Sequence, residues 1–346
     1  MELRSAGRHG AHRTTIVAGM LALIPTCQRH APIGTANEIA VVASRGVWDA
    51  LDQEIIATLE PRTFMVRHER ILRVAYAEPE DLVSSDLRRM RRLLLVGSAE
   101  EPLIAQAFAG RDANGLTPPT VVLLPDVWAK NQIVTVALLP DTAQADALAP
   151  LLPRIRDAFL RQFDEHIRRG MAVIPTNEWL AERLRRVTGA TLAVPQTYMP
   201  EQLDTDVFVF RQEEQGFTPV ARTITIDSRA RDAIDWTPEA VGQWRSELAE
   251  QANRPPHVTE PSATALRGEL AGQPTLQIRG VWSTPPGEWP SAGPFTARMV
   301  DCSERVFLID AWLYAPVDDK YEYMYQLDRI LDTFKCPTEQ HSAAAG

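Results

Sequence analysis

Hydrophobic positions along the chain alternate between short continuous runs and helical spacing, and this pattern predicts an α+β fold. Continuous apolar runs predict buried strands at 39–42, 93–96, 121–124 and 133–139. Helical spacing predicts helices at 45–59, 148–163, 176–187, 237–248 and 319–334. Further strands are expected at 207–210, 222–226, 275–282, 295–301 and 305–314. The Pro- and Gly-rich segment 253–274 is expected to be a surface loop.

The order of these elements indicates two lobes, each a mixed, largely antiparallel sheet with helices packed on one face. We expect the N-terminal lobe at 37–170, the C-terminal lobe at 171–336 and a disordered tail at 337–346. The two halves echo each other, because a strand, a proline and a helix follow one another near Pro140 and again near Pro316. A distant internal duplication would explain this echo, and two unrelated strand–helix units would look the same.

Residues 1–26 have the pattern of a signal peptide. Arginines at the front precede an apolar run at 16–24, which is much shorter than the roughly twenty residues that a spanning helix needs. The run ends at Ile24-Pro25-Thr26-Cys27, and bacterial lipoprotein signals end in an apolar residue, two small residues and a cysteine. The sequence therefore predicts lipid attachment at Cys27, a tether at 27–36, and a body held to a membrane of the cell envelope.

We expect this membrane to be the outer membrane and the body to face the periplasm. The alternative is an ordinary secretory signal with an incidental cysteine, which would release a soluble periplasmic protein.

Composition narrows the choice of partners. The formal net charge of −9 argues against nucleic acid, because phosphate binding needs a basic surface. The other two cysteines, Cys302 and Cys336, lack the C-x-x-C spacing of a metal site. The strand pair turns near Ser303 and the last helix returns toward that turn, which predicts that the two thiols lie close together. They form either a disulfide, as an oxidising envelope permits, or two free thiols.

Two groups of residues are candidates for a ligand cleft. The first comprises Asp126, Trp128, Asn131 and Gln132, and the second comprises Arg279, Trp282 and Tyr314. Tryptophan and arginine often anchor binding sites. The structural alternative is that Trp282 fills the core, Gly280 permits close strand packing, Gly293-Pro294 makes a turn, and the residues around Asp126 satisfy backbone groups.

These motifs also carry a family resemblance. Arg279-Gly280-Val281-Trp282, Gly293-Pro294-Phe295 and Tyr314-Ala315-Pro316 resemble an uncharacterised lipoprotein family of Bacteroidota, known only as a domain of unknown function. The segment 126–132 resembles a second motif of that family, and the resemblance runs from about Ala36 to Lys335. Ala292 departs from the family pattern, which has a second glycine there. The resemblance implies an envelope location and a lipid anchor, and it implies no reaction.

The sequence carries no catalytic signature. It lacks a G-x-S-x-G elbow, a phosphate-binding glycine loop, a dinucleotide glycine fingerprint and an H-E-x-x-H zinc motif, and no cofactor or metal is expected. We therefore expect a non-catalytic binding or scaffold protein with an envelope protein as partner. The alternative is an envelope hydrolase whose carboxylate or histidine site is not visible in one sequence. The basic run 88–92 is expected to solvate a helix end, or to contact anionic lipid headgroups.

Overall fold

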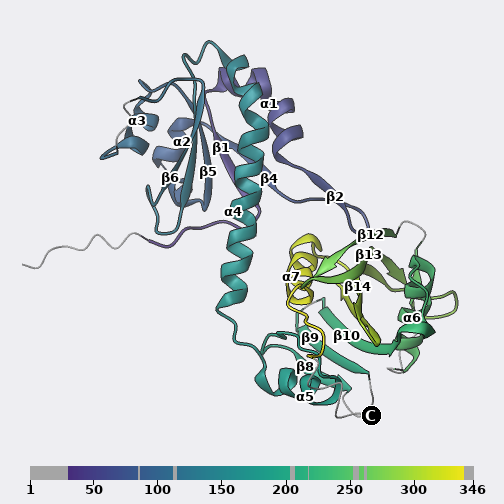
Figure 1. The fold of residues 1–346 in the computed structure, drawn as a ribbon. Coiled ribbons are helices and arrows are strands. Elements are labelled where there is room, and N and C mark those ends of the chain that lie inside the picture. The colour runs from purple at the N-terminus through teal and green to yellow at the C-terminus, as the bar shows by residue number, and fades with distance from the viewer. Residues whose placement is uncertain are drawn as a thin grey trace, which may run out of the picture.

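The computed structural model describes residues 30–84, 86–111, 115–202, 207–216, 218–251, 257–260 and 263–338. Residues 1–26, Cys27 and most of the predicted tail therefore lie outside the described residues. The predicted α+β class is confirmed: two lobes each hold a sheet with helices packed on it (Figure 1).

The sheet of the N-terminal lobe has the strand order β4-β1-β5-β7-β6 among the described residues. Its strands are β1 (Glu38–Val42), β4 (Arg73–Ala77), β5 (Arg92–Gly97), β6 (Thr120–Pro125) and β7 (Ile133–Leu138). The pairs β1–β4, β1–β5 and β5–β7 are parallel, and only the edge strand β6 runs antiparallel. The mixed sheet predicted for this lobe is confirmed, but most of its strand pairs are parallel and not antiparallel.

Helices cover both faces of this sheet, whereas the sequence predicted helices on one face only. One face packs against α1 (Arg45–Leu59) and the long helix α4 (Leu152–Ala172), and the other packs against α2 (Pro79–Ser84) and α3 (Pro102–Phe108). Burial on both faces explains why β5 reads as a continuous apolar run, with every residue buried. Such a run indicates cover on both faces, and the one-face prediction did not take it into account.

The C-terminal lobe is built on an antiparallel sheet of order β11-β13-β14-β15-β10-β9-β8, with β12 also paired to β13. Its strands are β8 (Met199–Gln202), β9 (Phe208–Glu214), β10 (Val220–Ala230), β11 (Val258–Thr259), β12 (Thr264–Leu270), β13 (Gln273–Ser283), β14 (Ala292–Cys302) and β15 (Arg305–Tyr314). Helices α5 (Glu178–Thr188) and α7 (Tyr321–Leu331) pack on one face and α6 (Pro238–Gln251) on the other. The one-face prediction is wrong here too.

Two local predictions fail for identifiable reasons. The expected loop 253–274 contains β11 and β12, which pair with β13 although their side chains are mostly exposed and give no apolar pattern. The turn predicted at Gly293-Pro294 lies instead inside β14, opposite Trp282 and Val281 of β13. Gly293 is required there, because an added Cβ would lie 1.9 Å from the carbonyl oxygen of Leu313.

Prolines and caps set the helix boundaries. A 3₁₀ turn, η2 (Ala145–Leu151), precedes α4, and Pro153 lies in the first turn of α4, where a proline costs no hydrogen bond. Helix α5 is capped by Asn177, whose side chain accepts from Leu180 N, one residue after the predicted start at 176. Its end at Gly189 is left-handed, with φ 74°, as the glycine predicts. Two further 3₁₀ turns are η1 (Asp86–Arg89) and η3 (Arg231–Ala233).

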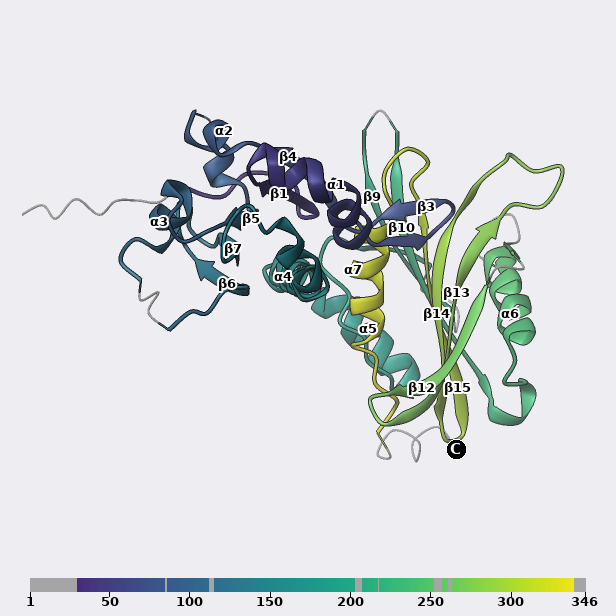
Figure 2. The ribbon, with the colours of Figure 1, turned by 90° about the horizontal axis from the view of Figure 1, so that it is seen from above.

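A hairpin joins the two lobes. Strands β2 (Arg62–Phe64) and β3 (His68–Arg70) leave the N-terminal lobe and reach over the C-terminal lobe beside α7 (Figure 2). The buried carboxylate of Glu69 accepts hydrogen bonds from the backbone N–H groups of Lys320 (2.6 Å) and Tyr321 (3.2 Å). It thereby caps α7 from the other lobe, close to the start that helical spacing predicted at 319.

The two sheets differ too much to support an internal duplication. Strand β7 lies between a parallel and an antiparallel neighbour, whereas β15 lies between two antiparallel neighbours. The echo along the sequence reflects only that a strand precedes a helix in both places.

Candidate functional site

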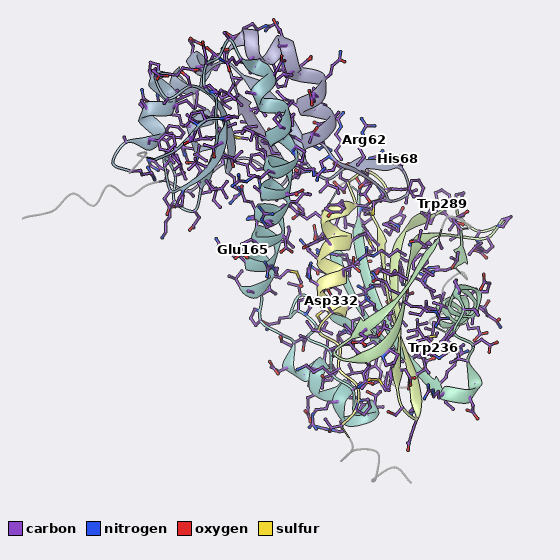
Figure 3. All side chains as sticks on the ribbon, turned by 45° about the horizontal axis from the view of Figure 1, so that its top comes forward. Arg62, His68, Glu165, Trp236, Trp289 and Asp332 are labelled. Carbon is purple, nitrogen blue, oxygen red and sulfur yellow. A yellow bond between two sulfur atoms is a disulfide. The ribbon has the colours of Figure 1, made fainter. Side chains whose placement is uncertain are left out.

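The hairpin and α7 border a cleft of about 530 Å³, which we call the hairpin cleft. Its walls come from β2 and the following turn, from the start of β12, from β13 and β14, and from one side of α7. The residues that line it are Thr63, Phe64, Met65, Thr264, Arg279, Gly280, Pro294, Phe295, Thr296, Tyr321, Met324, Tyr325, Asp328, Arg329 and Asp332. Figure 3 labels Arg62 and His68 on the hairpin and Asp332 at the end of α7, which lie on either side of this region.

Asp328 is the centre of the charge network in the hairpin cleft. Its Oδ2 accepts from Arg279 Nη2 at 2.7 Å, and its Oδ1 accepts from Arg298 Nη2 at 2.9 Å. The hydroxyl of Thr296 donates to the same Oδ1 at 2.8 Å. Two guanidinium groups and a hydroxyl hold this carboxylate in place, because charge-assisted hydrogen bonds are about twice as strong as neutral ones.

A second set of contacts continues along α7. Asp332 Oδ1 lies 3.3 Å from Arg298 Nη2, and Asp332 Oδ2 lies 3.6 Å from Arg329 Nη1. Arg329 donates to the Tyr325 hydroxyl at 2.8 Å, and this hydroxyl donates to Asp164 of α4. These contacts join both lobes around the cleft.

Aromatic rings supply the apolar part of the cleft. Phe64 is 49% exposed, which is high for a large apolar side chain. Tyr321 and Tyr325 lie with ring centroids 6.1 Å apart, and both rings pack near Phe163 of α4. Burial raises the pKa of Tyr321, so its hydroxyl stays protonated and can donate a hydrogen bond at neutral pH.

A neighbouring cleft of about 570 Å³, the lobe cleft, opens on the other side of the hairpin and shares Tyr321 with the hairpin cleft. The two arginines that line it pair with acids: Arg70 with Glu60 at 3.3 Å, and Arg73 with Asp319. Glu322 also lines it, and burial raises the pKa of its carboxyl group.

No two of the described acids with raised pKa values line the same one of these clefts. Besides Glu322, burial raises the pKa of Asp227, which accepts from Trp244 Nε1 at 2.7 Å, and of Asp310, which binds Arg245 at 2.7 Å inside the C-terminal lobe. A general acid and base would need two such groups around one space. Among the described residues no group of three or more His, Cys, Asp and Glu side chains could hold a metal ion.

Of the second candidate group, only Arg279 lies in the hairpin cleft. Trp282 is 3% exposed, donates to the Leu313 carbonyl at 3.3 Å and stacks on His257, with centroids 4.4 Å apart. Tyr314 packs against the same apolar cluster. Trp282 therefore fills the core, as the structural alternative states, and does not line the cleft.

The first candidate group forms the turn between β6 and β7. Asp126 and Asn131 have positive φ angles of 52° and 64°, and Asp126 Oδ1 accepts from Asn131 N at 2.5 Å. Gln132 is fully buried, accepts from Trp128 N at 3.0 Å and donates to the Met90 carbonyl at 2.7 Å. The side chains of Asp126 and Gln132 thus satisfy backbone groups, and the turn lies in the other lobe from Arg279.

The structure joins Cys302 and Cys336 in a disulfide, with Cα atoms 5.4 Å apart. The bond ties the segment after α7 to the end of β14. It lies beside the apolar cluster that α7 helps to form, so it holds one wall of the hairpin cleft to the sheet.

The sequence did carry one unused signal for the hairpin cleft. Tyr321, Tyr325, Asp328 and Asp332 recur at helical spacing on the side of α7 away from its apolar stripe. Aromatic and acidic residues in such a stripe are typical of a helix face that contacts something other than water. Phe64 had no such signal, because the hairpin folds over a lobe that begins more than a hundred residues later.

Comparison with known proteins matches part of the chain to a family model. Residues 178–333 match the model of a domain of unknown function, DUF4837, which spans the C-terminal lobe and α7 and leaves the N-terminal lobe unmatched. Of the resemblance that the sequence suggested, this match supports a domain of unknown function at residues 178–333. A comparison with curated proteins gave no match.

Among solved structures, the chain is similar to the Ran-binding protein Mog1p of Saccharomyces cerevisiae, at 13% identity and a TM-score of 0.30, over 44% of this chain and 92% of that one. It is also similar to a protein of Bacteroides thetaiotaomicron, at 9% identity and a TM-score of 0.26, over 44% of this chain and 47% of that one. Likenesses of this size carry no conclusion about function. No helix among the described residues is long and apolar enough to cross a membrane.

Proposed function

We propose that this protein is a lipid-anchored binding protein of the bacterial cell envelope, attached through Cys27, and that its hairpin cleft holds a segment of a partner protein. The anchor is supported by the leader, whose apolar run of nine residues is followed by Ile24-Pro25-Thr26-Cys27. A lipid on Cys27 would leave the two lobes at the membrane surface, and we place that surface on the periplasmic side of the outer membrane.

The observation that carries a binding role is the state of the charges in the hairpin cleft. Asp328 and Asp332, the carboxylates that line it, are engaged by arginines. Arginines occupy the oxygens of these two carboxylates, so the described lining of the cleft offers no free pair of acids for a hydrolase of the two-carboxylate kind. Paired charges beside half-exposed aromatic rings are instead a surface that recognises a ligand.

A protein segment fits this surface better than a small molecule does. Within the described residues β12 pairs only with β13, so its other edge offers backbone donors and acceptors next to the cleft. Leu266 on this strand is 68% exposed, and Thr264 at its start lines the cleft. An extended segment could pair with the edge of β12 and place side chains between Phe64 and Tyr325.

Two experiments test the proposal separately. For the anchor, the Cys27→Ser chain is expected to lose the mass of a lipid and to leave the membrane fraction. If the unlipidated chain stayed firmly attached to the membrane, the proposed anchor would be contradicted. Release of the wild-type body into the periplasm would favour the soluble alternative.

For the cleft, a photo-crosslinking amino acid at Phe64 is compared in living cells with the same probe at Trp289, which is 83% exposed and lies outside the hairpin cleft (Figure 3). We expect one discrete protein adduct from position 64 alone, which the Arg279→Ala change weakens. Equal adducts at both positions, or none at position 64, would refute binding in the cleft.

A further inference from the structure

A third cleft, of about 470 Å³, lies in the N-terminal lobe between the sheet and the C-terminal half of α4. We call it the arginine cleft. Arg91, Arg92, Leu123, Asn131, Ile133, Ala158, Arg161, Gln162, Glu165, His166, Arg169, Gly170 and Val173 line it. Figure 3 labels Glu165 on the part of α4 that projects below the sheet.

The charge of the arginine cleft is one-sided. Four arginines and a histidine face a single carboxylate among its described lining residues, and that carboxylate, Glu165, is already bound by Arg169 at 2.8 Å and by Arg168 at 3.1 Å. No salt bridge joins Arg91, Arg92 or Arg161 to any acid in the described part of the chain. This contrasts with the hairpin cleft, where arginines and carboxylates neutralise one another.

Buried donors in this cleft lack acceptors. Arg92 is only 1% exposed, yet its Nε and Nη1 have no hydrogen-bond partner among the described residues. The same holds for Arg91 Nε and for Gln162 Nε2. A buried guanidinium without an acceptor is costly, and an anion with several oxygens would satisfy these donors together.

The chain that leads to Cys27 leaves the protein beside this cleft. The first described residues pair with the segments that line it: Lys130 N donates to the His30 carbonyl at 3.1 Å, and Arg91 N donates to the Ile33 carbonyl at 2.9 Å. Cys27 is three residues before His30 and can therefore lie at most about 11 Å from it. A lipid on Cys27 would bring the bilayer surface to the cleft.

The rim of the arginine cleft is apolar. Val173 is 80% exposed and Leu123 is 45% exposed, and both line the cleft. Basic residues next to exposed aliphatic side chains match the boundary between lipid headgroups and acyl chains.

We propose that the arginine cleft binds the phosphate of an anionic phospholipid headgroup and so provides a second, reversible contact with the membrane. Arg92 and Gln162 hold the phosphate oxygens from inside, Arg91 and Arg161 add charge, and Val173 contacts the acyl boundary. The inference uses the proposed anchor only to bring the bilayer near. It is tested without a lipid on Cys27, so the two ideas can fail independently.

The experiment uses the full-length Cys27→Ser chain and vesicles of phosphatidylcholine, with or without phosphatidylglycerol. We expect flotation only with the vesicles that contain phosphatidylglycerol, weakened by salt because screening shortens the reach of exposed charges. The Arg91→Gln/Arg161→Gln variant should bind these vesicles about thirtyfold more weakly, since each basic residue near the surface contributes about a fivefold factor.

The matched control is Arg154→Gln/Arg186→Gln, which removes the same charge outside the arginine cleft and should bind as the parent does. Unchanged circular dichroism confirms that each variant folds. Equal losses in both variants, or binding without preference for phosphatidylglycerol, would overturn the proposal. Saturable binding of inorganic phosphate with no binding to vesicles would overturn the lipid as the source of the anion.

Discussion

Replacing Arg92 by methionine should make the protein more stable. Arg92 begins β5, and its guanidinium is buried under α4 about 6.0 Å from the centroid of the Phe163 ring. Burial, with a smaller effect from Arg91, lowers the pKa of Arg92 to about 10. The guanidinium is therefore still charged at neutral pH, and the folded state pays for its lost hydration at every pH below about 10.

The size of the effect follows from this pKa. One pKa unit corresponds to about 1.4 kcal/mol, so the lowering disfavours the charged form by about 3 kcal/mol in the folded protein. Methionine keeps most of the aliphatic contact and loses a cation–π attraction of about 1 kcal/mol with Phe163. We expect a net gain of about 1–2 kcal/mol in the free energy of unfolding.

Urea unfolding at pH 7 measures this gain as a higher midpoint with an unchanged slope. Arg92→Lys is the control, because it keeps a buried charge and should give no gain. A loss of more than 1 kcal/mol in Arg92→Met would show that the guanidinium has a partner in the folded protein, and the reasoning would fail. The same variant should lose affinity for vesicles containing phosphatidylglycerol, so that stability and binding change in opposite directions.

Four other substitutions test the architecture, each by urea unfolding unless stated. Arg245→Met should cost about 3–5 kcal/mol by leaving the buried carboxylate of Asp310 alone, and adding Asp310→Leu should recover most of this loss. Glu69→Ala should cost about 3 kcal/mol and speed proteolysis between the lobes, because it removes the cap and ion pair at the start of α7. Gly293→Ala should cost about 3 kcal/mol or more, because its Cβ has no space. Burial raises the pKa of Glu322, so the ionised carboxylate destabilises the folded protein at pH values above that pKa. The Glu322→Gln protein should therefore be more stable than the parent at pH 7. The two proteins should be equally stable at pH values below the ordinary pKa of a glutamate.

Local pattern predicted most elements of the fold because each strand and helix carries its own burial signal. The buried runs became β1, β5, β6 and β7, and helical spacing located α1, α4, α5, α6 and α7 to within a few residues. Strand direction was not predictable in the same way. A strand that is buried on both faces has the same composition whether its neighbours are parallel or antiparallel, so β5 gave no warning that the first sheet is mostly parallel.

The elements that failed depend on contacts between distant parts of the chain. Strand β12 is exposed along almost its whole length and exists because β13 pairs with it, so its own residues look like a loop. The cap of α7 is Glu69, which lies 251 residues before Lys320. No pattern among the residues next to α7 can indicate a cap that lies so far away in the sequence.

The same reasoning explains why the motifs predicted the site poorly. The residues that stand out in the sequence, Trp282 and Gln132, stand out because a tightly packed core needs them, and both are buried. Residues that line a cleft are less constrained in type, since arginine, tyrosine and phenylalanine also occur singly on ordinary surfaces. The balance of charge distinguishes the two clefts. Arginines bind the carboxylates of the hairpin cleft. Arg92 in the arginine cleft, in contrast, has no acid within bonding distance among the described residues. That balance depends on which distant segments meet, so it exists only in the folded chain and makes the unmatched cleft the one that requires an anion.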